Sequence, residues 1–124
     1  MLTLKVLLLM VLCHIIDDFV LQPVCLSKLK QKSWWEANAP DKLYKNDYKM
    51  ALFIHALSWS IMINLPIMLL CPGVPDFMIL LSVVTNCVLH AWIDNMKANE
   101  REINLILDQC FHLLQILVTF IILY

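Results

Sequence analysis

The sequence predicts an all-α integral membrane protein, a four-helix bundle with an interfacial cytoplasmic segment between its first two spans. Of its 124 residues, 61% are apolar and only 15% are charged, whereas a soluble domain of this size carries about 25% charged residues. Four stretches also approach the roughly 20 mostly apolar residues that a helix needs to cross a bilayer. Because the chain has one glycine and no Ser- or Gly-rich linker, we expect a single membrane domain over residues 1–124.

The four expected spans cover residues 2–22, 50–70, 77–95 and 103–124. The first resembles a signal peptide, because Lys5 precedes an apolar stretch. We expect it to be retained, since His14 and Asp18 interrupt its second half and no small-residue cleavage site follows. Between the second and third spans, the turn CPGVP at residues 71–75 breaks the chain sharply.

The sizeable polar segment at residues 26–49 is expected to lie on the membrane surface. Aromatic rings beside lysines suit the headgroup region of a bilayer. Here six lysines alternate with four aromatic residues, namely Lys28, Lys30, Lys32, Lys42, Lys45 and Lys49 with Trp34, Trp35, Tyr44 and Tyr48. An ordinary solvated loop is the alternative interpretation.

The basic residues predict the orientation of the chain in the membrane. With four spans, the loops at residues 26–49 and 96–102 lie on the same side, and together they hold every Lys and Arg except Lys5. The positive-inside rule therefore places both loops in the cytoplasm and both termini outside. The net charge of −1 argues against nucleic acid as a partner.

Ionisable residues recur within the expected spans at a spacing of four. The pairs are His14 with Asp18, His90 with Asp94, and Asp108 with His112, and the second span adds His55. An ionisable group inside a membrane costs about 2.5–3.5 kcal/mol on insertion scales and usually marks function. Residues four apart on a helix also point in the same direction.

The order within these pairs predicts two layers. The first and third spans run in one direction and the fourth runs in the other. Because the fourth span carries Asp108 before His112, whereas the other pairs begin with histidine, its histidine comes level with the other histidines. Its aspartate likewise comes level with the other aspartates. We therefore expect a histidine layer deeper in the membrane and an aspartate layer nearer the cytoplasm.

Four imidazoles and three carboxylates in a bundle core indicate a metal site. The candidate ligands are His14, Asp18, His55, His90, Asp94, Asp108 and His112. Nitrogen and carboxylate ligands suit zinc, manganese or iron, and this number could hold one or two ions. Asp18, Asp94 and Asp108 are also the candidate catalytic residues, since a free carboxylate can act as general base. The alternative is a set of hydrogen-bonded His–Asp pairs that hold the bundle together without metal.

Other polar residues lie close to these pairs in the sequence and could orient the ligands. They are Asp17, Gln22, Asn86, Lys97 and Gln109. Lys97 lies at the cytoplasmic mouth, where it either binds an anionic group or extends its ammonium group to the interface. Trp59 and Trp92 are expected to be packing or interfacial residues.

The motifs HIIDDFVLQ at residues 14–22, HAWIDNMK at 90–97 and DQCFH at 108–112, together with His55, resemble a family of small bacterial and phage membrane proteins. That family is catalogued as a domain of unknown function, and Lys28 also matches its pattern. The resemblance covers nearly the whole chain and implies the same membrane topology and the same grouping of residues. It implies a bacterial inner membrane as the location, and no particular activity.

Three functions remain open from the sequence. The favoured hypothesis is a metal-dependent hydrolase that acts on a phosphoester or another amphiphilic, lipid-like substrate at the cytoplasmic face. The second is a transporter or channel for divalent metal or protons, although polar residues beyond the histidine layer are sparse. The third is a membrane partner protein with a structural metal site. Oligomerisation is compatible with all three.

Overall fold

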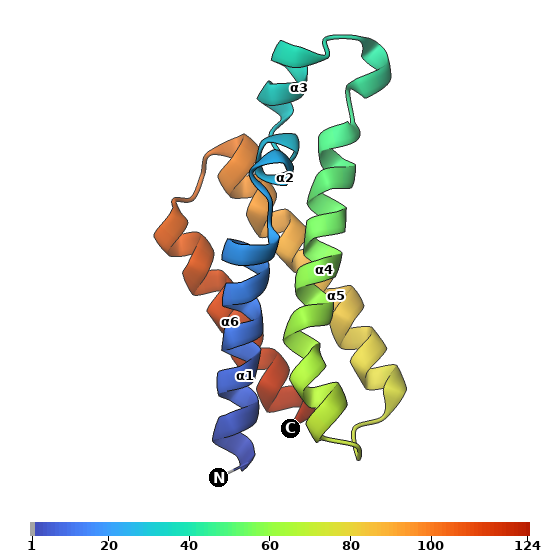
Figure 1. The fold of residues 1–124 in the computed structure, drawn as a ribbon, viewed down its shortest axis with the longest axis vertical. Coiled ribbons are helices and arrows are strands. Elements are labelled where there is room, and N and C mark those ends of the chain that lie inside the picture. Colours follow the sequence, from blue (N-terminus) through green and yellow to red (C-terminus); the bar gives the residue numbers. More distant parts are fainter. Residues whose placement is uncertain (1) are drawn as a thin grey trace.

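The computed structural model describes residues 2–124, and those residues form helices joined by short turns (Figure 1). The all-α prediction is confirmed. In chain order the elements are α1 (Leu2–Ile16), the π-helical turn η1 (Asp17–Leu21), α2 (Val24–Leu29), α3 (Lys32–Asn38), the 3₁₀ turn η2 (Lys42–Tyr44), α4 (Asp47–Leu70), α5 (Asp76–Asn95), the π-helical turn η3 (Met96–Glu100) and α6 (Leu105–Leu123).

Three of the helical segments are long and apolar enough to cross a membrane. They cover Lys42–Leu70, Asp76–Glu100 and Leu105–Leu123, which contain most of the second, third and fourth expected spans. The first expected span, residues 2–22, is helical to Leu21 but consists of the 15-residue α1 followed by η1. At 1.5 Å per residue, α1 alone is about 22 Å long, and it is not among the three segments that are long and apolar enough to cross a membrane.

The long helices pack side by side, with α4 against α1 and α5, and α6 against α1 and α5 (Figure 1). The apolar core lies toward the end of the molecule that holds both termini. Its buried residues are Val6 and Met10 of α1, Trp59, Ile63 and Ile67 of α4, and Ile116 and Leu123 of α6. The adjoining layer of the interior is polar, and it contains the histidines and aspartates described below.

The segment between α1 and α4 folds into the short helices α2, α3 and η2, and it extends beyond the ends of α4, α5 and α6 (Figure 1). Asn99 of η3 ties this segment to the rest of the molecule. Its Nδ2 donates to the Lys30 carbonyl oxygen at 3.1 Å, and its Oδ1 accepts from the Lys32 amide at 2.7 Å. This attachment holds Lys30 beside the end of α5.

Both His-x-x-x-Asp segments end in a π-helical turn. His14 lies near the end of α1, and η1 begins at Asp17; His90 and Asp94 lie near the end of α5, and η3 begins at Met96. Single π-helical turns are rare in proteins overall, and those that occur are often at functional sites. Although Asp17 and Asp18 are neighbours in sequence, both carboxylates reach groups of α4 from η1.

Candidate metal centre

All seven residues predicted as ligands come together in one place between α1, α4, α5 and α6. His14, His55, His90, Asp94, Asp108 and His112 are buried, and the side chain of Asp18 is 10% exposed. This group is called the His–Asp cluster below. The spacing of four within each pair accounts for the shared direction on a helix, and the packing of the four helices brings the pairs into contact.

The carboxylate of Asp94 lies at the middle of the cluster, facing three imidazoles. Its Oδ2 is 3.5 Å from Nε2 of His55 and 3.9 Å from Nε2 of His90. Its Oδ1 is 3.7 Å from Nε2 of His112. The same nitrogen of each ring therefore points to the same carboxylate.

Two further carboxylates complete the ring of ligand atoms. Oδ1 of Asp18 lies 3.2 Å from His55 Nε2, and Oδ1 of Asp108 lies 3.3 Å from His112 Nε2. Ligand atoms bound at about 2.0–2.1 Å around a tetrahedral ion are roughly 3.3 Å apart. These two separations match that spacing, whereas the three between Asp94 and the imidazoles are longer.

Two groups of ligand atoms are close enough to hold an ion. One comprises Asp18, His55 and His90, and the other comprises His90, Asp94 and His112; within each group the atoms lie within 4.8 Å of one another. The groups share His90. One ion near His90, or two ions on either side of it, would each satisfy this arrangement.

Several buried polar atoms of the cluster have no hydrogen-bond partner among residues 2–124. They include Asp18 Oδ1, both ring nitrogens of His90, Asp108 Oδ1 and His112 Nε2. An unsatisfied buried polar group costs about 1–3 kcal/mol, and more when it is charged. Four of these atoms, all except Nδ1 of His90, face the centre of the cluster. The donor set therefore fits a metal ion.

The outer nitrogens of two histidines contact orienting groups. His55 Nδ1 lies 3.7 Å from Asp17 Oδ2, and the other oxygen of Asp17 accepts from Ser58 Oγ at 2.6 Å. His112 Nδ1 lies 3.3 Å from Gln115 Oε1. A metal-binding histidine commonly donates its second N–H to a carboxylate or amide oxygen, which fixes the tautomer and leaves Nε2 free as a ligand.

His14 differs from the other histidines because protein groups engage both of its nitrogens. Its Nδ1 accepts a 2.8 Å hydrogen bond from the indole of Trp59, and its Nε2 lies 3.1 Å from Gln109 Oε1. The amide nitrogen of Gln109 donates to Asp18 Oδ2 at 3.3 Å and to Asp108 Oδ2 at 3.1 Å. His14 belongs to neither of the two ligand groups, and its contacts suit a residue that positions Gln109 and the aspartates.

Two lysines contact the aspartates from the side of the π-helical turns. Lys30 Nζ lies 2.5 Å from Asp94 Oδ2 and donates to Gln22 Oε1 at 2.6 Å. Lys97 Nζ lies 2.5 Å from Asp108 Oδ2 and 3.8 Å from Asp94 Oδ1. The side chain of Lys30 is buried, whereas that of Lys97 is 30% exposed, so Lys97 connects the cluster to its surroundings.

The cluster carries an excess of negative charge. Three carboxylates belong to the cluster itself, those of Asp18, Asp94 and Asp108. The carboxylate of Asp17 and the ammonium groups of Lys30 and Lys97 contact it and are counted with it. With neutral imidazoles, these groups leave a formal charge of −2. One divalent cation would neutralise this charge, and so would two protons held on imidazoles.

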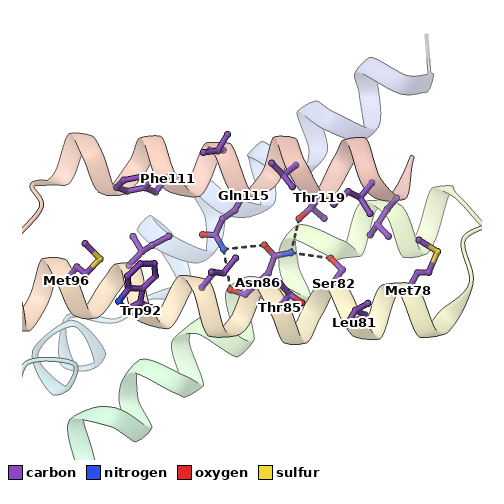
Figure 2. A pocket seen from close by; sticks show the side chains of 16 residues that line it. Met78, Leu81, Ser82, Thr85, Asn86, Trp92, Met96, Phe111, Gln115 and Thr119 are labelled. Atoms are coloured by element: carbon purple, nitrogen blue, oxygen red, sulfur yellow. Dashed lines mark hydrogen bonds between the residues drawn. The ribbon is translucent and has the colours of Figure 1, made fainter.

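The remaining predicted supporting residue, Asn86, reaches the cluster through another side chain. Its carbonyl and amide groups bond to Gln115 at 3.3 Å, Thr119 at 2.8 Å and Ser82 at 3.2 Å. Gln115 in turn contacts His112. Figure 2 shows this polar network between α5 and α6.

Sequence reasoning missed four contributors, namely Lys30, Ser58, Trp59 and Gln115. The last three follow a cluster histidine by three or four residues on its own helix, and this helical spacing could have found them. Trp59 also stacks on His90, with ring centroids 4.2 Å apart, and is fully buried. It is thus a packing residue, one of the two predicted alternatives, and its contact with the cluster is what the sequence reasoning missed. Lys30 carries no such signal among the neighbouring lysines, and Lys28, which the resemblance suggested, is exposed on α2.

A family model described as a protein of unknown function, DUF3307, matches residues 6–124. The chain therefore belongs to this family. No curated protein and no solved structure matches it.

Proposed function

We propose that this member of the DUF3307 family is a four-span integral membrane protein that holds a divalent transition metal and hydrolyses a phosphoester or lipid-like substrate. The spans are α1 with η1, α4, α5 with η3, and α6. Both termini lie outside, and the lysine-rich segment lies at the cytoplasmic face of the bacterial inner membrane. Zinc, manganese or iron suits the ligand set, as one or two ions.

The distribution of side chains supports membrane insertion. Large apolar residues are exposed on all four long helices, for example Leu8 of α1 (58%), Phe53 of α4 (49%), Leu80 of α5 (64%) and Ile121 of α6 (69%). Several polar residues in the middle of these helices are buried instead, among them Ser60, Asn64, Asn86 and Gln115. Hydrocarbon around the helices would accommodate both features, because it accepts exposed leucine and excludes unpaired charge.

The convergence of unpartnered buried ligand atoms carries the metal proposal. His55, His90 and His112 direct Nε2 toward Asp94, and Asp18 adds a further oxygen. The formal charge of −2 adds support, because burying uncompensated carboxylates is costly. In this arrangement, Asp17 contacts Nδ1 of His55 and Gln115 contacts Nδ1 of His112. These contacts hold both imidazoles in the tautomer that leaves Nε2 free.

Asp108 is the residue we assign as general base. It lies outside both ligand groups, its Oδ1 is unpartnered, and Lys97 beside it is the partly exposed basic side chain. A bound divalent ion would polarise the phosphoryl oxygen and lower the pKa of a nearby water. Asp108 would take a proton from the attacking water as the water oxygen bonds to phosphorus. The bond between phosphorus and the leaving oxygen would break, and protonated Asp108 would return the proton to that oxygen. Lys97 would bind the anionic group.

Metal analysis of the purified protein tests this proposal first. The full chain would be purified in detergent under metal-sparing conditions, and its metals measured by elemental mass spectrometry. We expect about one or two equivalents in the wild type and in Asp108→Asn, and loss of metal in His90→Ala. Metal-loaded protein would then be screened against phosphoester and lipid-phosphate substrates, on which Asp108→Asn should be inactive. A folded wild type that takes up no metal after reloading would overturn the metal proposal, and bound metal without hydrolysis would favour a structural site.

One observation favours a transporter of protons or divalent metal as the second candidate. A hydrogen-bonded chain continues from the cluster away from the lysines, through Gln115, Asn86 and Ser82 to Asn64. Asn64 then donates to the Ser60 carbonyl oxygen at 2.8 Å. Uptake of metal or protons by proteoliposomes containing the full chain would identify this function, and Asn86→Leu should abolish the uptake.

A further inference from the structure

An apolar groove runs along the outer side of the α5–α6 pair, next to the His–Asp cluster. Its volume is about 480 Å³, within the range of about 300–1,000 Å³ that is usual for ligand sites. Met78 and Met96 lie toward its two ends in Figure 2, with Phe111 and Trp92 near the Met96 end. The described side chains do not fill this space.

Most polar side chains of the groove are already paired with one another. Asn86 and Gln115 bond to each other, and Asn86 also donates to Thr119 and Ser82 (Figure 2). The walls are apolar side chains, such as Leu81 and Val118. The groove therefore offers hydrocarbon contact along its length and few free hydrogen-bonding groups.

The shape of the groove selects a slender occupant. The 18 residues from Met78 to Met96 rise about 27 Å along α5. A groove of that length, lined mostly by apolar side chains of only two helices, suits an extended hydrocarbon chain.

A basic residue adjoins the Met96 end of the groove. Lys97 follows Met96 directly in η3, and its partly exposed Nζ contacts Asp108 of the cluster. A chain in the groove would thus place its terminal group near Lys97 and next to the proposed general base. An ammonium group at that position favours an anionic terminal group such as a phosphate.

We propose that the α5–α6 groove binds a single long hydrocarbon chain whose terminal phosphate lies at Lys97. This inference rests on the proposed function for the role of the phosphate as a reacting group, and it names the substrate class as a single-chain lipid phosphate. The binding itself needs only the groove and Lys97. It is therefore measurable with or without metal.

The test measures binding of a long-chain polyprenyl monophosphate to the full-length protein in detergent by native mass spectrometry. The polyprenol of the same length lacks the phosphate, and phosphatidic acid carries a phosphate on two acyl chains. We expect one polyprenyl phosphate per protein, bound about tenfold or more tightly than either control lipid, a difference of about 1.4 kcal/mol. Lys97→Gln should remove the preference for phosphate over alcohol and leave polyprenol binding unchanged.

Two matched pairs of variants test the position of the chain. Leu81 and Leu80 are adjacent on α5 and similarly exposed, at 63% and 64%, and Leu81 lines the groove whereas Leu80 does not. Val118 and Leu117 of α6 form a second such pair, at 46% and 44% exposure. Leu81→Trp and Val118→Trp should each weaken binding about tenfold or more, while Leu80→Trp and Leu117→Trp should not.

Three results would overturn the inference. One is binding that the groove variants leave unchanged, and another is phosphatidic acid binding as tightly as polyprenyl phosphate. The third is a wild-type dimer that Leu81→Trp and Val118→Trp separate while their control variants do not, because a second copy would then occupy the groove. Repeating the measurement after chelation separates this inference from the metal proposal. Lipid binding by a protein that takes up no metal would contradict the metal proposal alone, and metal binding without lipid binding would contradict this inference alone.

Discussion

The indole N–H of Trp59 donates a 2.8 Å hydrogen bond to Nδ1 of His14. Because Nδ1 accepts, the proton of a neutral His14 must be on Nε2, which faces Gln109 Oε1 at 3.1 Å. The same indole ring stacks on His90. Trp59 therefore sets the tautomer of one histidine through its edge and supports a second through its face.

Trp59→Phe separates these two roles. The phenyl ring retains an aromatic face for His90 but leaves Nδ1 of His14 without a donor, at a cost of about 1–3 kcal/mol for an unsatisfied buried group. We expect a lower unfolding temperature in detergent and metal affinity weakened by about tenfold, as for the loss of an orienting contact. Trp92→Phe is the control, since Trp92 is 59% exposed. Equal effects of the two substitutions would contradict the role given to Trp59.

Asp17→Asn tests the orientation of His55. The substitution keeps an oxygen that can accept from Ser58 but removes the charge that faces Nδ1 of His55 at 3.7 Å. Metal affinity should fall by about 10–100-fold with unchanged stoichiometry, as measured by competition with a fluorescent chelator. Asp76→Asn, at an exposed position on α5, should leave affinity unchanged. Complete loss of metal would instead make Asp17 a direct ligand.

Lys30→Met tests whether both the metal and Lys30 neutralise the negative charge of the buried carboxylates. Removing Lys30 leaves Asp94 buried without its 2.5 Å partner, and breaking a buried ion pair costs about 3–5 kcal/mol. Chelator-treated protein should therefore be strongly destabilised, and saturating metal should restore a large part of the loss. Thermal unfolding with and without metal measures both effects.

Lys28→Met is the matched control for Lys30→Met, because Lys28 is exposed two residues earlier in the same segment. Its effect on stability should stay within about 0.5 kcal/mol, which is usual for surface substitutions. If Lys30→Met destabilised metal-free and metal-loaded protein equally, the cluster would not use metal to offset its charge.

Asn86→Leu distinguishes packing from conduction in the polar network. Asn86 bonds to Gln115, Thr119 and Ser82, and hydrogen bonds between membrane helices contribute about 0.6 kcal/mol each on average. We expect a moderate loss of stability, with metal stoichiometry and hydrolysis retained. Proteoliposome uptake that disappears in Asn86→Leu while the protein stays folded would favour the transporter instead.

The helices and the grouping of the cluster residues are accessible from the sequence. Apolar stretches interrupted by few charges predict long helices, and a spacing of four places His90 and Asp94 on one face. The reversed order of Asp108 and His112 predicts pairs that meet at matching depth between helices of opposite direction. These are properties of helical geometry, so they need no knowledge of how the helices pack.

The identity of each contact depends on the tertiary structure. His14 and His90 have the same spacing to an aspartate, yet Trp59 and Gln109 engage both nitrogens of His14, while His90 has no hydrogen-bond partner among the described residues. Lys30 contacts Asp94 across 64 positions of sequence because Asn99 holds its segment beside η3. The sequence by itself determines the helices and the direction of each pair, because both follow from local spacing. Only the packing of α1, α4, α5 and α6 decides which nitrogen, carboxylate or ammonium group each residue meets, because those distances depend on contacts between helices far apart in the chain.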